Sequence, residues 1–77
     1  MTIKLFDTVE AVCDLPKANI KTGMLGAVIE IFDKPNLAYE VEFCNKKGQT
    51  VAQAALLPEQ IIKANITKEE YNNRIPD

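Results

Sequence analysis

The sequence contains no histidine and no tryptophan, and only 6% of its 77 residues are aromatic. Histidine is the side chain whose ordinary pKa suits proton transfer near neutral pH, so its absence removes the usual general base of an enzyme. Grooves that bind proline-rich ligands are lined by aromatic side chains, and two tyrosines and three phenylalanines are too few to favour such a groove. The missing residue types argue against both kinds of site.

Cysteine is also scarce. Cys13 and Cys44 lie in separate apolar segments without the spacing of metal ligands, and neither has an obvious base nearby to activate it. We expect two buried free thiols, as is usual in the reducing cytoplasm. Glu40 and Glu42 would share one face of a strand, but a solvated face does not tune a carboxylate pair for catalysis. We therefore expect a protein that is not an enzyme, with no catalytic residue, metal or cofactor.

No apolar run approaches the roughly 18 residues that a membrane-spanning helix needs. The acidic Asp7 comes too early in the chain for the apolar region of a signal peptide. We expect a cytoplasmic protein without a membrane partner.

The length allows one domain, and a barrel of this size fills its interior with its own side chains.

Positive charge is not in excess, because nine lysine and arginine residues are set against eleven aspartate and glutamate residues, for a net charge of −2. Nucleic-acid binders usually carry a basic surface, since neutralising phosphates and releasing counterions supplies much of their affinity. The charge balance makes a protein a better candidate partner than a nucleic acid.

What the sequence does contain is a series of short apolar segments separated by turn residues, with a spacing of about ten residues that is typical of small barrels and sandwiches. Apolar and polar residues alternate in 39–44, which indicates a strand with one buried face. In 26–32 apolar residues occupy both alternating sets, so we expect a central strand covered on much of both faces. The alanines of 49–56 would also suit a helix, but the preceding turn favours a strand. We predict strands at 7–13, 26–32, 39–44, 49–56 and 61–64, a long loop at 14–23 and a helical turn at 57–61.

Residues 66–77 are expected to form a tail after a domain at 1–65. Thr67 is followed three residues later by Glu70, which is the capping-box pattern of a helix N-terminus, and Pro76 prevents the helix from continuing. We predict a helix of about two turns whose cap contributes about 1 kcal/mol. The sequence leaves open whether this tail is ordered without a partner.

The predicted order of five strands, a long first loop and a tight turn before the last strand resembles that of SH3-like barrels. Residues 21–30 also resemble the glycine-x-x-glycine-x-valine segment of KOW-type barrels, where glycines let the loop bend sharply into a strand. Over residues 3–63 the chain resembles the bacterial domain of unknown function 4926 family. That resemblance rests on LFDTV at 5–9, DLP at 14–16, GMLGAV at 23–28, YEVEF at 39–43 and LPEQI at 57–61. It implies a mainly β, five-stranded SH3-like barrel and assigns no activity. The tail after Ala64 is outside it.

Two surfaces are candidate partner-binding sites. In SH3-like barrels the long first loop commonly faces a partner; here its apolar side chains either fold back onto the barrel or form a contact patch with a basic rim. The loop residues are Leu15, Pro16, Lys17, Ile20, Lys21 and Met24. The second surface is acidic and is formed by Glu30, Glu40 and Glu42 on adjacent strands, either as a soluble face or as a site for a basic partner.

We hypothesise a non-catalytic protein-binding module, such as an immunity protein, an antitoxin or an accessory subunit of a larger bacterial protein. The alternative is a KOW-like nucleic-acid or ribonucleoprotein binding domain, suggested by the segment from Gly23 to Val28 and by Lys17, Lys21, Lys46 and Lys47. The sequence does not identify the partner, the biological process, the oligomeric state or a redox role for the cysteines.

Overall fold

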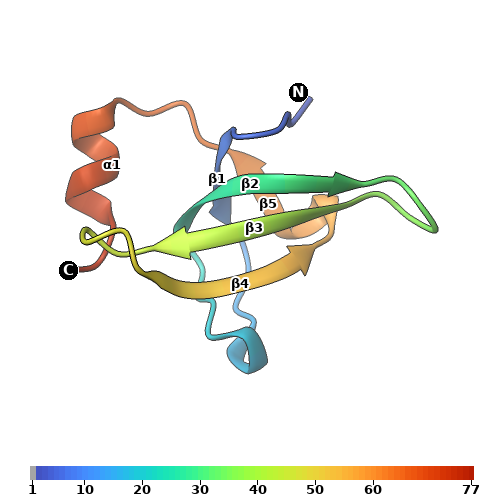
Figure 1. Cartoon of the computed structure of the whole chain (residues 1–77), viewed down its shortest axis with the longest axis horizontal. Helices are drawn as coiled ribbons and strands as arrows, with labels where there is room; N and C mark the ends of the chain where they lie inside the picture. The colour runs from blue at the N-terminus through green and yellow to red at the C-terminus, as the bar shows by residue number, and fades with distance from the viewer. Residues whose placement is uncertain (1) are drawn as a thin grey trace.

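A computed structural model describes residues 2–77, and this part of the chain forms one antiparallel sheet of five strands with a short helix at its C-terminal end (Figure 1). The strands are β1 (Thr8–Ala11), β2 (Leu25–Phe32), β3 (Ala38–Cys44), β4 (Thr50–Leu56) and β5 (Ile61–Lys63). Two 3-10 turns, η1 (Pro16–Ala18) and η2 (Pro58–Gln60), interrupt the connections, and the helix is α1 (Lys68–Arg74).

The strand order across the sheet is β4-β3-β2-β1-β5, with every neighbouring pair antiparallel. The mainly β fold, the five strands and the C-terminal helix are confirmed, as is a strand rather than a helix over the alanine-rich 50–56. In the described residues β4 and β5 are the two edges of the sheet and do not pair with each other. The pairing leaves the sheet open, so closure into a barrel stays a prediction.

The core lies on one face of this sheet. Along β3 the apolar residues Tyr39, Val41 and Phe43 are buried and the glutamates between them are half-buried, as the alternation predicted. Side chains from all five strands and from the first loop fill this core, which explains how so short a chain excludes water from its interior. The buried cluster is Val9, Ala11, Ile20, Val28, Tyr39, Val41, Phe43, Ala52, Leu56 and Ile61.

Strand β2 differs from the expectation of two covered faces. Its first half is buried, but Ile29, Ile31 and Phe32 each remain more than a third exposed. The reason is the extent of its neighbour. β1 pairs with Leu25–Ala27 and the residues just before β1 bond to Val28, so the rest of β2 lies beside β3 alone. The β2–β3 hairpin therefore projects from the sheet, as Figure 1 shows.

Gly23 and Gly26, the two glycines of the segment that resembles KOW-type barrels, are required for two different reasons. Gly23 has a φ of +93°, a left-handed conformation that side chains disfavour, although there is open space around it. Gly26 is buried in β2, where an added Cβ would lie 2.7 Å from Val41 Cγ1 and 2.9 Å from the carbonyl oxygen of Glu42. A side chain would therefore be strained by the backbone conformation at Gly23 and would clash with its neighbours at Gly26.

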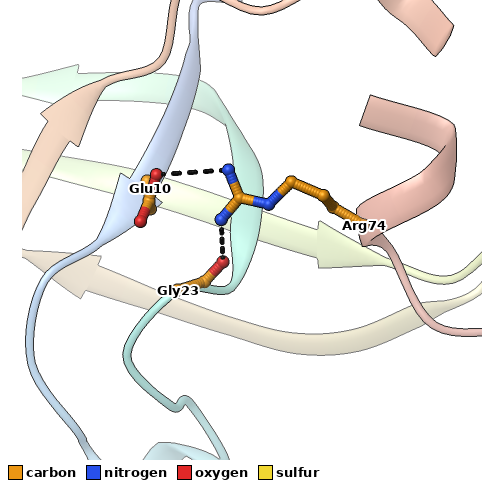
Figure 2. Close-up of polar contacts among 3 residues, drawn as sticks. All are labelled: Glu10, Gly23 and Arg74. Atoms are coloured by element: carbon orange, nitrogen blue, oxygen red, sulfur yellow. Dashed lines mark hydrogen bonds and ion pairs between the residues drawn. The ribbon is translucent and has the colours of Figure 1, made fainter. Parts of the chain in front are cut away.

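The tail packs back onto the sheet. Thr67 Oγ1 accepts a hydrogen bond from the Glu70 N–H, and the Glu70 carboxylate accepts one from the Thr67 N–H, both at 3.1 Å, which confirms the capping box. At the other end of α1, Arg74 reaches Glu10 and the carbonyl oxygen of Gly23 (Figure 2), and the side chain of Ile75 is buried. Within residues 2–77 no helix is long and apolar enough to cross a membrane.

Candidate binding groove

An apolar groove with a volume of about 500 Å³ lies between the first loop, the C-terminal half of β4 and η2. Apart from Lys17 and Gln60, its lining side chains are apolar. The first loop supplies one wall, and the end of β4 supplies the other. The complete lining is Leu15, Pro16, Lys17, Ala18, Ala54, Ala55, Leu56 and Gln60.

The wall formed by the first loop is built by local hydrogen bonds. Leu15 and Ile20 exchange two backbone hydrogen bonds of 2.8 and 3.1 Å, which close the loop around η1. Pro16 begins η1, where its missing N–H costs nothing, and Asn19 ends it with a φ of +61° that asparagine tolerates. The Asn19 Nδ2 group then donates to the carbonyl oxygen of Val51 at 3.3 Å, so the loop is attached to β4.

The base of the same loop is fixed by Asp14. Its carboxylate accepts hydrogen bonds from the backbone N–H of Thr22 at 2.8 Å and from the Thr22 hydroxyl at 2.9 Å. These two bonds, the backbone one first, lower the pKa of Asp14, because they stabilise the ionised form. The loop wall is therefore held at both its base and its tip.

The structure divides the predicted loop residues between surface and core. Pro16 and Lys17 are exposed and line the groove, and Leu15 lines it while packing partly against the core. Ile20 is only 1% exposed, so this residue folds back into the core and is not part of a surface patch. Met24 is half-buried against the core, where its sulfur accepts a hydrogen bond from the Lys21 N–H. Lys21 is exposed and borders a smaller hollow of about 250 Å³ on the loop.

Sequence reasoning missed the strand half of the groove. Ala54, Ala55 and Leu56 meet the loop only after β4 has paired with β3, and Gln60 is brought in by η2. One sequence signal was available, since 50–56 carries no charge and contains three alanines, an unusual composition for a strand at the edge of a sheet. That signal has meaning only when the strand is known to be an edge.

The three acidic residues of the second surface fall on one face of the sheet. Glu30 and Glu40 are directly opposite each other in the β2–β3 register, and Glu42 is two residues further along β3. Glu40 accepts a hydrogen bond from Gln53 at 2.9 Å, and Glu42 accepts one from Thr50. None of the ion pairs formed within residues 2–77 involves these three carboxylates. The face therefore carries three negative charges without a cationic partner from the described chain.

The candidate lysines of a nucleic-acid surface lie in two different places. Lys17 and Lys21 belong to the first loop, whereas Lys46 and Lys47 lie in the β3–β4 hairpin, and Figure 1 shows this hairpin beside α1 and away from η1. Lys46 is also paired with Asp77 at 3.3 Å. The fold does not bring the four lysines into one patch.

The described residues contain no group of three or more carboxylate or thiol side chains placed to hold a metal ion, and no buried polar or charged residue. Cys13 and Cys44 are free, but they are half-buried and not fully buried as expected. The groove can therefore take up apolar surface, and the acidic face can attract positive charge.

Residues 5–63 match the family described as Domain of unknown function (DUF4926). No curated protein and no solved structure matches the chain significantly. The match begins before β1 and ends with β5, so it covers the whole sheet and both walls of the groove and leaves α1 outside. The chain belongs to the DUF4926 family, whose function is unknown.

Proposed function

We propose that this chain is a non-catalytic protein-binding module that holds a segment of a larger protein in the groove between the first loop and β4. The observation that carries the proposal is the groove itself, because a concave site of about 500 Å³ with an almost entirely apolar lining is the usual form of a binding site. A wall fixed by the Asn19–Val51 and Asp14–Thr22 hydrogen bonds supports it further, since a preformed site loses less entropy on binding.

The acidic face suggests the kind of partner. Glu30, Glu40 and Glu42 would attract a basic protein and speed its approach, as suits an immunity protein or antitoxin that blocks the cleft of a basic enzyme. An accessory subunit of a larger bacterial protein would use the same two surfaces. In either case the module acts in the cytoplasm by occupying a site and not by chemical turnover.

The proposal is tested by affinity capture from a lysate of the native host with three forms of the full chain. Ala55→Lys places a long charged side chain at the groove. Asn72→Lys is the control, because it introduces the same charged side chain at an exposed position of α1 that neither lines the groove nor belongs to the acidic face. Circular dichroism and thermal unfolding establish that all three forms fold.

We expect the wild-type chain and Asn72→Lys to retain one protein in stoichiometric amount, and Ala55→Lys to lose it. The proposal is wrong if no protein is retained by the wild-type chain, or if all three forms retain the same protein equally.

The alternative, a KOW-like nucleic-acid or ribonucleoprotein binding domain, is supported by the glycine geometry at Gly23 and Gly26. The separation of the lysines between the loop and the hairpin makes it the weaker proposal. Its test is a mobility-shift measurement with RNA and DNA at low and high salt, where absence of binding at low salt removes it.

A further inference from the structure

We propose that the groove accepts an extended peptide, which adds as a sixth strand to the free edge of β4 and places an acidic side chain next to Lys17. This inference rests on the proposed function and names the form and chemistry of the bound segment.

The groove runs along the edge of β4. Three consecutive residues of β4, Ala54, Ala55 and Leu56, line it. Side chains of a strand alternate between the two faces of the sheet, so a site that touches three in a row runs along the edge of the strand and not over a face. The groove therefore exposes the backbone of β4 as well as its side chains.

The backbone of β4 is open to further pairing at this edge. β4 pairs with β3 on one side and has no strand on its other side within residues 2–77. Apart from the β3–β4 pairing, no backbone hydrogen bond in that range involves residues 52–56, whereas Val51 is engaged by Asn19. The edge beside the groove thus offers donors and acceptors in the geometry that an extended backbone satisfies.

Edges of sheets are usually protected against such pairing by lysine, proline or inward-pointing charge. β4 contains none of these, since its sequence is TVAQAAL. The alanines also leave room for the side chains of an added strand. An edge that lacks these protections and is bordered by a preformed wall is suited to hold a strand.

A second copy of the chain is a poorer occupant than a peptide. In a two-fold pairing of β4 with β4, the η1 turn of each copy would stand in the way of the other copy, because η1 lies beside the same edge. An isolated extended segment has no such neighbour and fits between η1 and the strand.

The positive charge of Lys17 indicates that the peptide carries an acidic residue. Lys17 is exposed at the groove, and none of the ion pairs of the described residues involves it. The other wall residues, Leu15, Pro16 and Ala18, are apolar. A matching segment therefore carries apolar side chains toward the loop and one aspartate or glutamate toward Lys17.

The experiment uses the full chain as bait for a displayed library of random twelve-residue peptides. We expect enriched peptides with alternating apolar residues, one acidic residue and no central proline. A synthetic copy of the best peptide is then N-methylated at one position at a time. Methylation should weaken binding at least tenfold at every second position, because only alternate N–H groups of an added strand point to the edge.

A charge exchange tests the role of Lys17. Lys17→Glu should weaken binding of the acidic peptide several-fold, and replacing the acidic residue of the peptide by lysine should restore it. Lys47→Glu, which makes the same change in the hairpin, is the control and should have no effect. Amide exchange should slow at residues 54–56 when the peptide binds.

The inference is overturned if no peptide is enriched, if N-methylation shows no alternation, if the bound peptide is helical, or if the bait instead self-associates through β4. Each of these results leaves the proposed function standing provided that capture still depends on Ala55. Loss of groove-dependent capture, by contrast, removes the proposed function whatever the peptides do.

Discussion

The guanidinium of Arg74, in the last turn of α1, donates a hydrogen bond of 2.8 Å to the carbonyl oxygen of Gly23, just before β2 (Figure 2). The same guanidinium lies 3.4 Å from the Glu10 carboxylate on β1. One side chain thus joins the tail, the end of the first loop and the first strand. The tail that the family match leaves out is attached to the sheet at this point.

Replacing Arg74 by alanine should lower the free energy of unfolding by about 1 kcal/mol, because a charged donor to a backbone carbonyl is lost at a partly exposed site. Glu10→Gln should cost less than about 0.5 kcal/mol, since a long, partly exposed ion pair contributes little and the bond to Gly23 remains. Urea denaturation measures both. Equal costs for the two variants would contradict the importance assigned to the Gly23 bond.

Gly26→Ala should destabilise the sheet by about 2 kcal/mol or more, because its Cβ would overlap Val41 and the backbone of Glu42 in a packed interior. Gly23→Ala should cost about 1–2 kcal/mol, which is the price of a left-handed φ in open space. Urea denaturation of the two variants gives the comparison. The assignment of these different causes is wrong if Gly23→Ala is the more damaging.

Thr67→Ala should reduce stability by about 1 kcal/mol by removing the side-chain acceptor for the Glu70 N–H. Thr67→Ser keeps a hydroxyl at the cap and should be nearly neutral. Amide exchange in α1, compared with exchange in β3, should accelerate in the alanine variant alone. Unchanged exchange in α1 would show that the cap does not limit fraying of the tail.

The Asp14–Thr22 contact predicts a pH dependence of the first loop. The hydrogen bonds from Thr22 lower the pKa of Asp14 in the folded chain, so their stabilisation is complete above the unfolded value of about 3.9 and is lost as the pH falls through the folded pKa. Thr22→Val removes the hydroxyl donor and should raise the pKa of Asp14 toward its ordinary value. Carboxyl NMR titration measures the pKa, and an identical value in both proteins would contradict the contact.

The residues themselves determined the parts of the fold that depend on local patterns. Alternation placed Tyr39, Val41 and Phe43 inside, the Thr67–Glu70 spacing located the helix, and the glycine spacing marked the bend into β2. Each of these features arises from neighbours within a few residues, so a single sequence contains enough information to predict it.

Other properties depended on which segments meet in space. Ile20 and Ile29 are similar apolar residues, yet the first is buried by the sheet beneath the loop and the second is exposed because β1 is too short to cover the end of β2. Half of the groove likewise exists only because β4 is an edge strand that lies beside η1. Burial and edge position are set by contacts between residues far apart in the chain, and therefore only the tertiary structure decided them.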